Sequence, residues 1–219
     1  MSNAYQVVRD FEQSVADFAG APYAVAVESC SAALFLSFLY CKAREAEQVI
    51  VPSITYPSVP ASVINAGGRV RFENIDWQKT GWYAMRVDVS RGEEIDSGVV
   101  IDSAKYLERG MWKKISQDCF TYACLSFHGK KHLKIGRGGM ILTDNKEAVE
   151  WFKMMRFDGR HEAALPTDTL QGVGWNMYLS PEQAARGLEQ LQWIGDGGVL
   201  PLDPYQNLSQ YKFYTEANR

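Results

Sequence analysis

Two adjacent lysines, Lys130 and Lys131, stand in a stretch that joins two apolar runs of the sequence. This stretch, SFHGKKHLKIGRGG, covers residues 126–139 and lies between FTYACL and MILTD. A serine such as Ser126 can contact a phosphate, and a lysine can form a Schiff base where a pocket lowers its pKa. A basic surface loop between two strands is the alternative. The mixture of basic residues with buried neighbours favours a site.

A second candidate lies at Glu28-Ser29-Cys30-Ser31, where an apolar run ends and a helix is expected to begin. The first turn of a helix presents free N–H groups and the positive end of the helix dipole, which together bind phosphate. Serine is also an ordinary N-cap residue. Taken alone, this stretch favours the capping role.

Asp102 ends the apolar run VVID. A carboxylate at the carboxyl end of a buried parallel strand lies at the ligand-binding edge of an α/β sheet. Because an unpaired buried carboxylate is costly, we expect a cationic or proton-donating partner. A role as the cap of a following helix is equally compatible with this position.

One cofactor would use all of these groups. Pyridoxal phosphate requires a phosphate cup, an acid opposite its pyridine nitrogen, an aromatic face and a lysine for its aldehyde. Tyr56, in the sequence PSITYPS, supplies the aromatic face. A metal site is not expected, because the chain has no CxxC pair and only three histidines.

The elements that must position these residues alternate along the chain. Strands are expected at residues 21–29, 47–53, 69–75, 98–102, 120–127 and 138–144, and helices at 5–19, 32–43, 59–67, 145–157 and 180–194. The strands are apolar throughout rather than alternating. This pattern predicts an α/β fold with three α/β/α layers around a mainly parallel sheet.

Composition limits the function classes. The chain has 219 residues, is 46% hydrophobic and has a net charge of -3, which predicts a packed core and gives no reason to expect nucleic-acid binding. No apolar segment approaches the roughly 20 residues that span a bilayer. The N-terminus lacks a basic region followed by an apolar run, so we expect a cytoplasmic protein without a secretory signal or membrane partner.

The chain resembles the DegT/DnrJ/StrS family of pyridoxal-phosphate sugar aminotransferases, which have fold type I, from about Val8 to Ile194. Five ordered segments carry the resemblance: VAVESCSAALFLSFL, VPSITYPSVPASVINAGGRVRFENID, VVIDSAKY, CLSFHGKKHLKIGRGGMILTDNKE and GWNMYLSPEQAARGLEQLQWI. The resemblance implies a cofactor-binding large domain over residues 1–196. Residues 197–219 would be a tail that is a remnant of the small domain or replaces it.

The resemblance also implies residue roles. Lys131, five residues after Ser126, would form the Schiff base with the cofactor and shuttle protons. Ser126 and Ser31 would hold the cofactor phosphate together with the backbone of Cys30.

Three further roles follow from the resemblance. Asp102 would keep the pyridine nitrogen protonated, and Tyr56 would stack on the ring. Asn176 would reach the phosphate bound by the other subunit, so the active unit would be a homodimer with shared active sites.

The sequence departs from the family in four places. Cys30-Ser31 stands where glycine-threonine is usual, and Lys105 stands where histidine or glutamine is usual. The segment between Asp76 and Val99 is short, and most of the family's C-terminal domain is absent from this chain. A partner chain, a tetramer or the aromatic residues 205–214 could complete the substrate site.

The implied reaction is amino transfer from glutamate to a keto-sugar nucleotide. Lys131 argues against the dehydratase branch of the family, in which histidine replaces the lysine. A transaminase for an amino-cyclitol or an amino acid is one alternative. A degenerate dimer with a regulatory or structural role, with or without the cofactor, is the other, and the short C-terminal part favours it.

Overall fold

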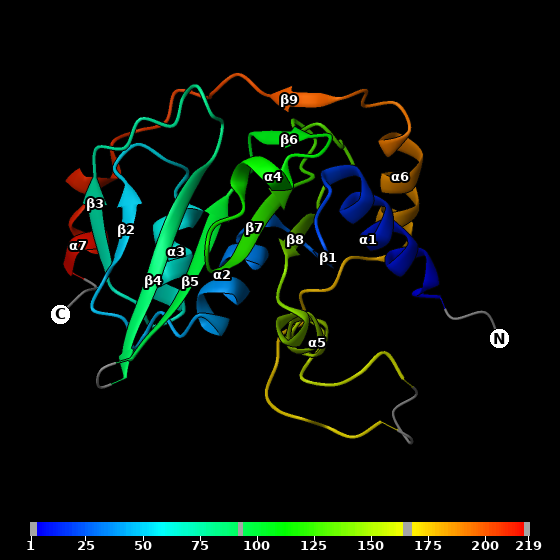
Figure 1. The fold of residues 1–219 in the computed structure, drawn as a ribbon, viewed down its shortest axis with the longest axis horizontal. Helices are drawn as coiled ribbons and strands as arrows, with labels where there is room; N and C mark the ends of the chain where they lie inside the picture. Colours follow the sequence, from blue (N-terminus) through cyan, green and yellow to red (C-terminus); the bar gives the residue numbers. More distant parts are fainter. Residues whose placement is uncertain (1–3, 92–93, 164–167, 217–219) are drawn as a thin grey trace.

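A five-stranded sheet forms the centre of the protein, as described by a computed structural model over residues 4–91, 94–163 and 168–216 (Figure 1). In the order of the sheet, the strands are β1 (Tyr23–Val27), β8 (Gly139–Thr143), β7 (Phe120–Ser126), β5 (Glu94–Asp102) and β4 (Tyr83–Arg91). A separate parallel pair, β2 (Val49–Pro52) and β3 (Val70–Glu73), lies beside β4 and extends the layer.

The α/β class is confirmed, and the mainly parallel sheet is corrected to a mixed one. β1, β5 and β7 run in one direction, but β4 and β8 run against them, so β5 with β7 is the parallel one of the four pairings. Every residue of β8 is buried. An antiparallel strand buried on both faces has the same continuous apolar run as a parallel strand, so composition could not reveal its direction.

β4 is a strand that was not predicted from the sequence. It pairs with β5 from Tyr83 opposite Asp102 to Arg91 opposite Glu94, and it fills the region expected to be reduced. Tyr83, Met85 and Val87 are buried on one face of β4, while the residues between them are exposed. The alternation is typical of a strand with one solvated face.

Helices cover both faces of the sheet, so the three-layer arrangement is confirmed. On one face, α2 (Cys30–Tyr40), α3 (Ser58–Asn65) and α5 (Lys146–Met155) enclose one core. On the other face, α1 (Gln6–Ala19), α6 (Pro181–Leu191) and the short α4 (Trp112–Ile115) enclose a second core. α1 and α6 pack closely because Gly187 lies against Phe11, where an added Cβ would stand 2.5 Å from the ring.

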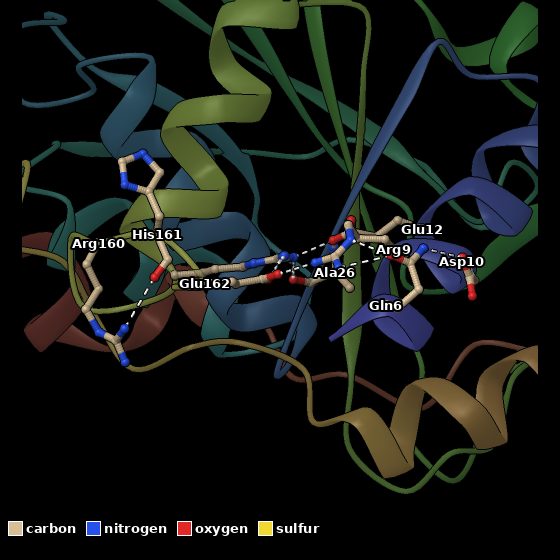
Figure 2. A network of polar contacts seen from close by, with 9 residues as sticks. Gln6, Arg9, Asp10, Glu12, Ala26, Arg160, His161 and Glu162 are labelled. Carbon is tan, nitrogen blue, oxygen red and sulfur yellow. Dashed lines mark hydrogen bonds and ion pairs between the residues drawn. The ribbon is translucent and has the colours of Figure 1, made fainter. Parts of the chain in front are cut away.

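A buried ion-pair network ties α1 and β1 to the segment after α5 (Figure 2). Arg156, which is 1% exposed, contacts the Glu12 carboxylate and the Ala26 carbonyl. Glu162 accepts from Arg156 at 3.1 Å and from Arg9 at 2.6 Å. A buried charge without a partner is costly, so moving α1, β1 or the segment after α5 away from Arg156 would be unfavourable. The network therefore fixes the relative positions of these three segments.

The C-terminal segment crosses one edge of the sheet, from the side of α6 to the side of β3 (Figure 1). Its first part, β9 (Gly197–Val199), pairs with β6 (Tyr106–Glu108). Its end forms η2 (Leu208–Gln210) and α7 (Lys212–Glu216), anchored by the Leu208 N–H on the Ser53 carbonyl at 2.7 Å. The predicted division after residue 196 stays a prediction, but the tail is packed against the sheet layers.

Candidate active site

A cavity of about 600 Å³ lies where β5 and β7 end and α2 begins. Six of the seven predicted site residues line it: Cys30, Ser31, Tyr56, Asp102, Ser126 and Lys131. The fold brings them together because strand ends and a helix start meet at this edge of the sheet. The tail forms another wall of the cavity with residues 203–206 and Leu208.

Lys131 lies in the loop after β7, where its N–H donates to the His128 carbonyl at 2.8 Å. Among the described residues, none forms a hydrogen bond or ion pair with its Nζ atom. Burial, followed by the positive charge of Lys105, lowers the pKa of Lys131 from its ordinary value. The neutral, nucleophilic amine is therefore available at a lower pH than in a free lysine.

Asp102 is buried at the end of β5, with 7% of the residue exposed. Its Oδ1 accepts from the Ala104 N–H at 2.9 Å, and its Oδ2 accepts from the Tyr83 hydroxyl at 2.9 Å. Thr55 Oγ1 in turn lies 2.5 Å from the Tyr83 hydroxyl. Burial raises the pKa of Asp102, while these hydrogen bonds and the charge of Lys131 oppose the rise. The alternative role as a helix cap is contradicted, because the next element is β6.

The start of α2 combines a cap with a potential anion site. Ser29 is the N-cap, and its Oγ accepts from the Ala32 N–H at 3.1 Å. The N–H groups of Cys30 and Ser31, at the first two positions of α2, have no acceptor within the helix. Burial raises the pKa of Cys30 well above its ordinary value, so its thiol stays protonated and contributes no negative charge. Gly139 lets the start of β8 lie close to the start of α2, since an added Cβ would lie 2.6 Å from the Cys30 nitrogen.

Three aromatic rings border the cavity. Tyr56, which is 56% exposed, was predicted, whereas Trp77 and Tyr205 were not. Trp77 stacks on Tyr205 with the ring centres 6.0 Å apart, and Tyr205 meets Tyr56 edge to face at 6.2 Å. The aromatic composition of the tail was the signal for Tyr205, although its place could not be derived from the sequence.

Lys105 is a second cavity lysine, and the tail holds it. Its Nζ donates to the Pro201 carbonyl at 2.9 Å and pairs with Asp203 Oδ2 at 2.8 Å. The hydrogen bond from Lys105 is the main cause of a lowered pKa of Asp203.

Asn176 lies outside the cavity in the single chain. It is exposed, its Nδ2 donates to Asp158 Oδ2 at 3.4 Å, and its backbone bridges to Phe157. Its predicted contact with the cofactor phosphate of another subunit stays a prediction.

The cavity residues fit pyridoxal phosphate. Four cationic side chains (Lys105, Lys130, Lys131 and Arg137) and two carboxylates (Asp102 and Asp203) line the cavity, a balance that favours an anionic ligand. The hydroxyls of Ser31 and Ser126 and the start of α2 suit a phosphate. Within the described part of the chain, no group of three or more His, Cys, Asp or Glu residues is arranged to hold a metal ion. No helix among the described residues is long and apolar enough to cross a membrane.

The chain belongs to the DegT/DnrJ/EryC1/StrS aminotransferase family, whose model matches residues 1–88 and 99–196. The resemblance seen in the five sequence segments is thus confirmed. The unmatched residues 89–98 fall where the end of β4 pairs with the beginning of β5. Between residues 1 and 196, this is the stretch that the family model does not match.

Individual relatives agree with this assignment. The chain is 25% identical to the spore coat polysaccharide biosynthesis protein SpsC of Bacillus subtilis, over 86% of this chain and 57% of that protein. It is 26% identical to the GDP-perosamine synthase of Caulobacter vibrioides, over 90% of this chain and 59% of that protein. The chain thus spans less than two thirds of the length of these relatives.

A solved structure shows the same fold. The pyridoxal-phosphate form of a proposed sugar aminotransferase from Streptococcus pneumoniae aligns with a TM-score of 0.68 at 16% identity. The alignment covers 85% of this chain and 59% of that chain. The α/β fold implied by the resemblance is therefore confirmed.

Proposed function

We propose that this chain carries the cofactor site of a pyridoxal-phosphate-dependent aminotransferase. The observation that carries the proposal is the meeting of Lys131, Asp102 and the start of α2 in one cavity. When bound, pyridoxal phosphate supplies an aldehyde that captures amines and a ring that withdraws electrons from the adjacent carbon. The residues of the chain provide binding, orientation and proton transfer.

Each cavity residue has one task in this proposal. Ser31, Ser126 and the Cys30 N–H bind the phosphate, and Tyr56 packs against the ring. Asp102 holds a proton at the pyridine nitrogen, because a carboxylate beside that atom favours its charged form. Lys131 Nζ binds the cofactor and then moves a proton from the donor substrate, a task suited to a lysine whose pKa lies below its ordinary value.

The substrates are part of the proposal. Glutamate is the amino donor, as the family resemblance implies. A keto-sugar nucleotide is the acceptor, which the name of the perosamine synthase supports. The excess of cationic side chains in the cavity is compatible with both anionic substrates.

The functional unit in this proposal is a homodimer in which Asn176 contacts the cofactor phosphate of the partner subunit. Sedimentation of the cofactor-loaded protein tests this assembly. Dilution below the dimer dissociation constant should release the cofactor. A fully loaded monomer would contradict the contact.

The test of the function is the absorption spectrum with added pyridoxal phosphate, before and after glutamate. A visible band that Lys131→Ala abolishes, and that glutamate bleaches in the wild-type protein, is the expected result. A band that ignores glutamate would favour a passive cofactor binder. The absence of any band would overturn the proposal.

A further inference from the structure

The cavity contains three lysines, Lys105, Lys130 and Lys131, but their amines are in different states. Lys105 is 5% exposed and has two acceptors from the tail, the Pro201 carbonyl at 2.9 Å and Asp203 Oδ2 at 2.8 Å. Lys130 is exposed to water. Lys131 Nζ has no hydrogen-bond or ion-pair partner among the described residues.

These states determine which amine can react with a carbonyl. An amine needs a free lone pair to attack a carbonyl carbon, and an ammonium that donates to a carboxylate has none. The carboxylate of Asp203 and the carbonyl of Pro201 both stabilise the charged form of Lys105. Lys105, which is buried, and Lys131, which is half-buried, would otherwise be two amines competing for one aldehyde.

We propose that Asp203 is a positioning residue that holds Lys105 Nζ as a paired ammonium and thereby makes Lys131 Nζ the reacting amine of the cavity. This inference rests on the proposed function. In the step concerned, a nitrogen–carbon bond forms between Lys131 Nζ and the aldehyde carbon. The aldehyde oxygen leaves as water with the two protons of the neutral amine.

The charges around Lys131 support the assignment. Lys105 lowers the pKa of Lys131, whereas Asp102, Cys30 and Asp203 act in the opposite direction and burial is the largest cause of the shift. A Lys105 that is charged, and held in place by the tail, therefore also favours the neutral form of Lys131. The tail thus acts on Lys131 through Lys105.

The experiment maps the modified lysine. Wild-type protein and Asp203→Asn are each incubated with pyridoxal phosphate, reduced with borohydride and digested, and the modified peptides are identified by mass spectrometry. Asp196→Asn is the matched control, since Asp196 directly precedes the tail and pairs with Arg109 outside the cavity. Asp203→Glu keeps the carboxylate and is the rescue variant.

In the wild-type protein and in Asp196→Asn, the modification should be found at Lys131. In Asp203→Asn, the fraction at Lys105 should rise about tenfold or more, the factor that corresponds to the loss of one charge-assisted hydrogen bond. Asp203→Glu should restore the wild-type pattern. Modification confined to Lys131 in Asp203→Asn would overturn the inference, whereas no modification of Lys131 in the wild-type protein would overturn the proposed function instead.

A second measurement does not depend on the cofactor. Acetic anhydride acetylates unprotonated amines, so the acetylation rate of Lys105 in the cofactor-free protein reports its release from Asp203. The rate should rise about tenfold in Asp203→Asn relative to Asp196→Asn. An unchanged rate in folded protein, checked by circular dichroism, would also overturn the inference. If Asp203→Asn fails to fold, the wild-type protein decides: Lys105 acetylation as fast as that of Lys130 would overturn the inference.

Discussion

The pKa of the Asp102 carboxyl group depends on its two hydrogen-bond donors, the Ala104 N–H and the Tyr83 hydroxyl. Tyr83→Phe removes one donor, so the pKa of Asp102 should rise further above 3.8. A carboxyl group whose pKa is higher in the folded than in the unfolded protein makes the protein less stable as the pH increases through the folded-state pKa. The variant should therefore cost about 1–3 kcal/mol at neutral pH and less in acid.

Urea unfolding at several pH values checks this cost. Tyr122→Phe is the matched control, because Tyr122 is also a buried tyrosine but its hydroxyl accepts from the Asn145 amide, which does not titrate. Equal pH dependence in the two variants would contradict the role of Tyr83.

Asp102→Asn should slow the glutamate-dependent spectral change by about a hundredfold or more, with a smaller effect on cofactor retention. The amide keeps the size of the side chain but cannot stabilise a proton on the pyridine nitrogen. Stopped-flow absorbance measures the rate. Asp118→Asn, at an exposed position outside the cavity, is the control. Unchanged turnover in Asp102→Asn would remove Asp102 from the mechanism.

At the scale of elements, the contact between the start of β8 and the start of α2 leaves no room for a side chain. A Cβ at Gly139 would lie 2.5 Å from the Ser29 carbonyl carbon. Gly139→Ala should therefore displace the start of α2, cost about 1–3 kcal/mol of stability and weaken pyridoxal-phosphate binding. Gly129→Ala is the control, because a Cβ there meets nothing within 4 Å. Cofactor titration and urea unfolding measure both effects. Equal pyridoxal-phosphate binding in the two variants would contradict the role of Gly139.

The elements also show what sequence could and could not predict. Six cavity residues were predictable because each stands at a strand end, at a helix start or in a loop that follows a strand, positions that local sequence marks. β4 was missed although Tyr83, Met85 and Val87 alternate with exposed residues in the way that marks a strand. The direction of β8 was not predictable, because burial on both faces gives the same apolar run in either direction.

The partners of the cavity residues were beyond local prediction. Tyr83 reaches Asp102 through strand pairing, and Asp203 reaches Lys105 from the far end of the chain. No periodicity or motif encodes such contacts, since they depend on how distant segments pack. For the same reason, the position of Asn176 relative to a second subunit does not follow from one chain.

At the scale of the whole molecule, the buried network around Arg156 joins the N-terminal α1 to the segment that follows α5. Glu12→Gln removes the charge that faces Arg156 and should destabilise the protein by about 3–5 kcal/mol, because a buried guanidinium loses its closest carboxylate. Asp88→Asn, which breaks an ion pair at the surface, should cost about 1 kcal/mol or less. Urea unfolding compares the two. Similar losses would show that Arg156 does not depend on Glu12.

The crossing of the tail over the sheet edge has a kinetic consequence. Lys105 and Pro201 are 96 positions apart, and the loop between them must close before the cavity has its tail wall. Closing a loop of that length costs conformational entropy. Helices form from contacts between residues close in the sequence and do not have this cost, so they should form first. In refolding, far-ultraviolet circular dichroism should thus recover before the protein can capture pyridoxal phosphate, and the delay would time the assembly of the cavity.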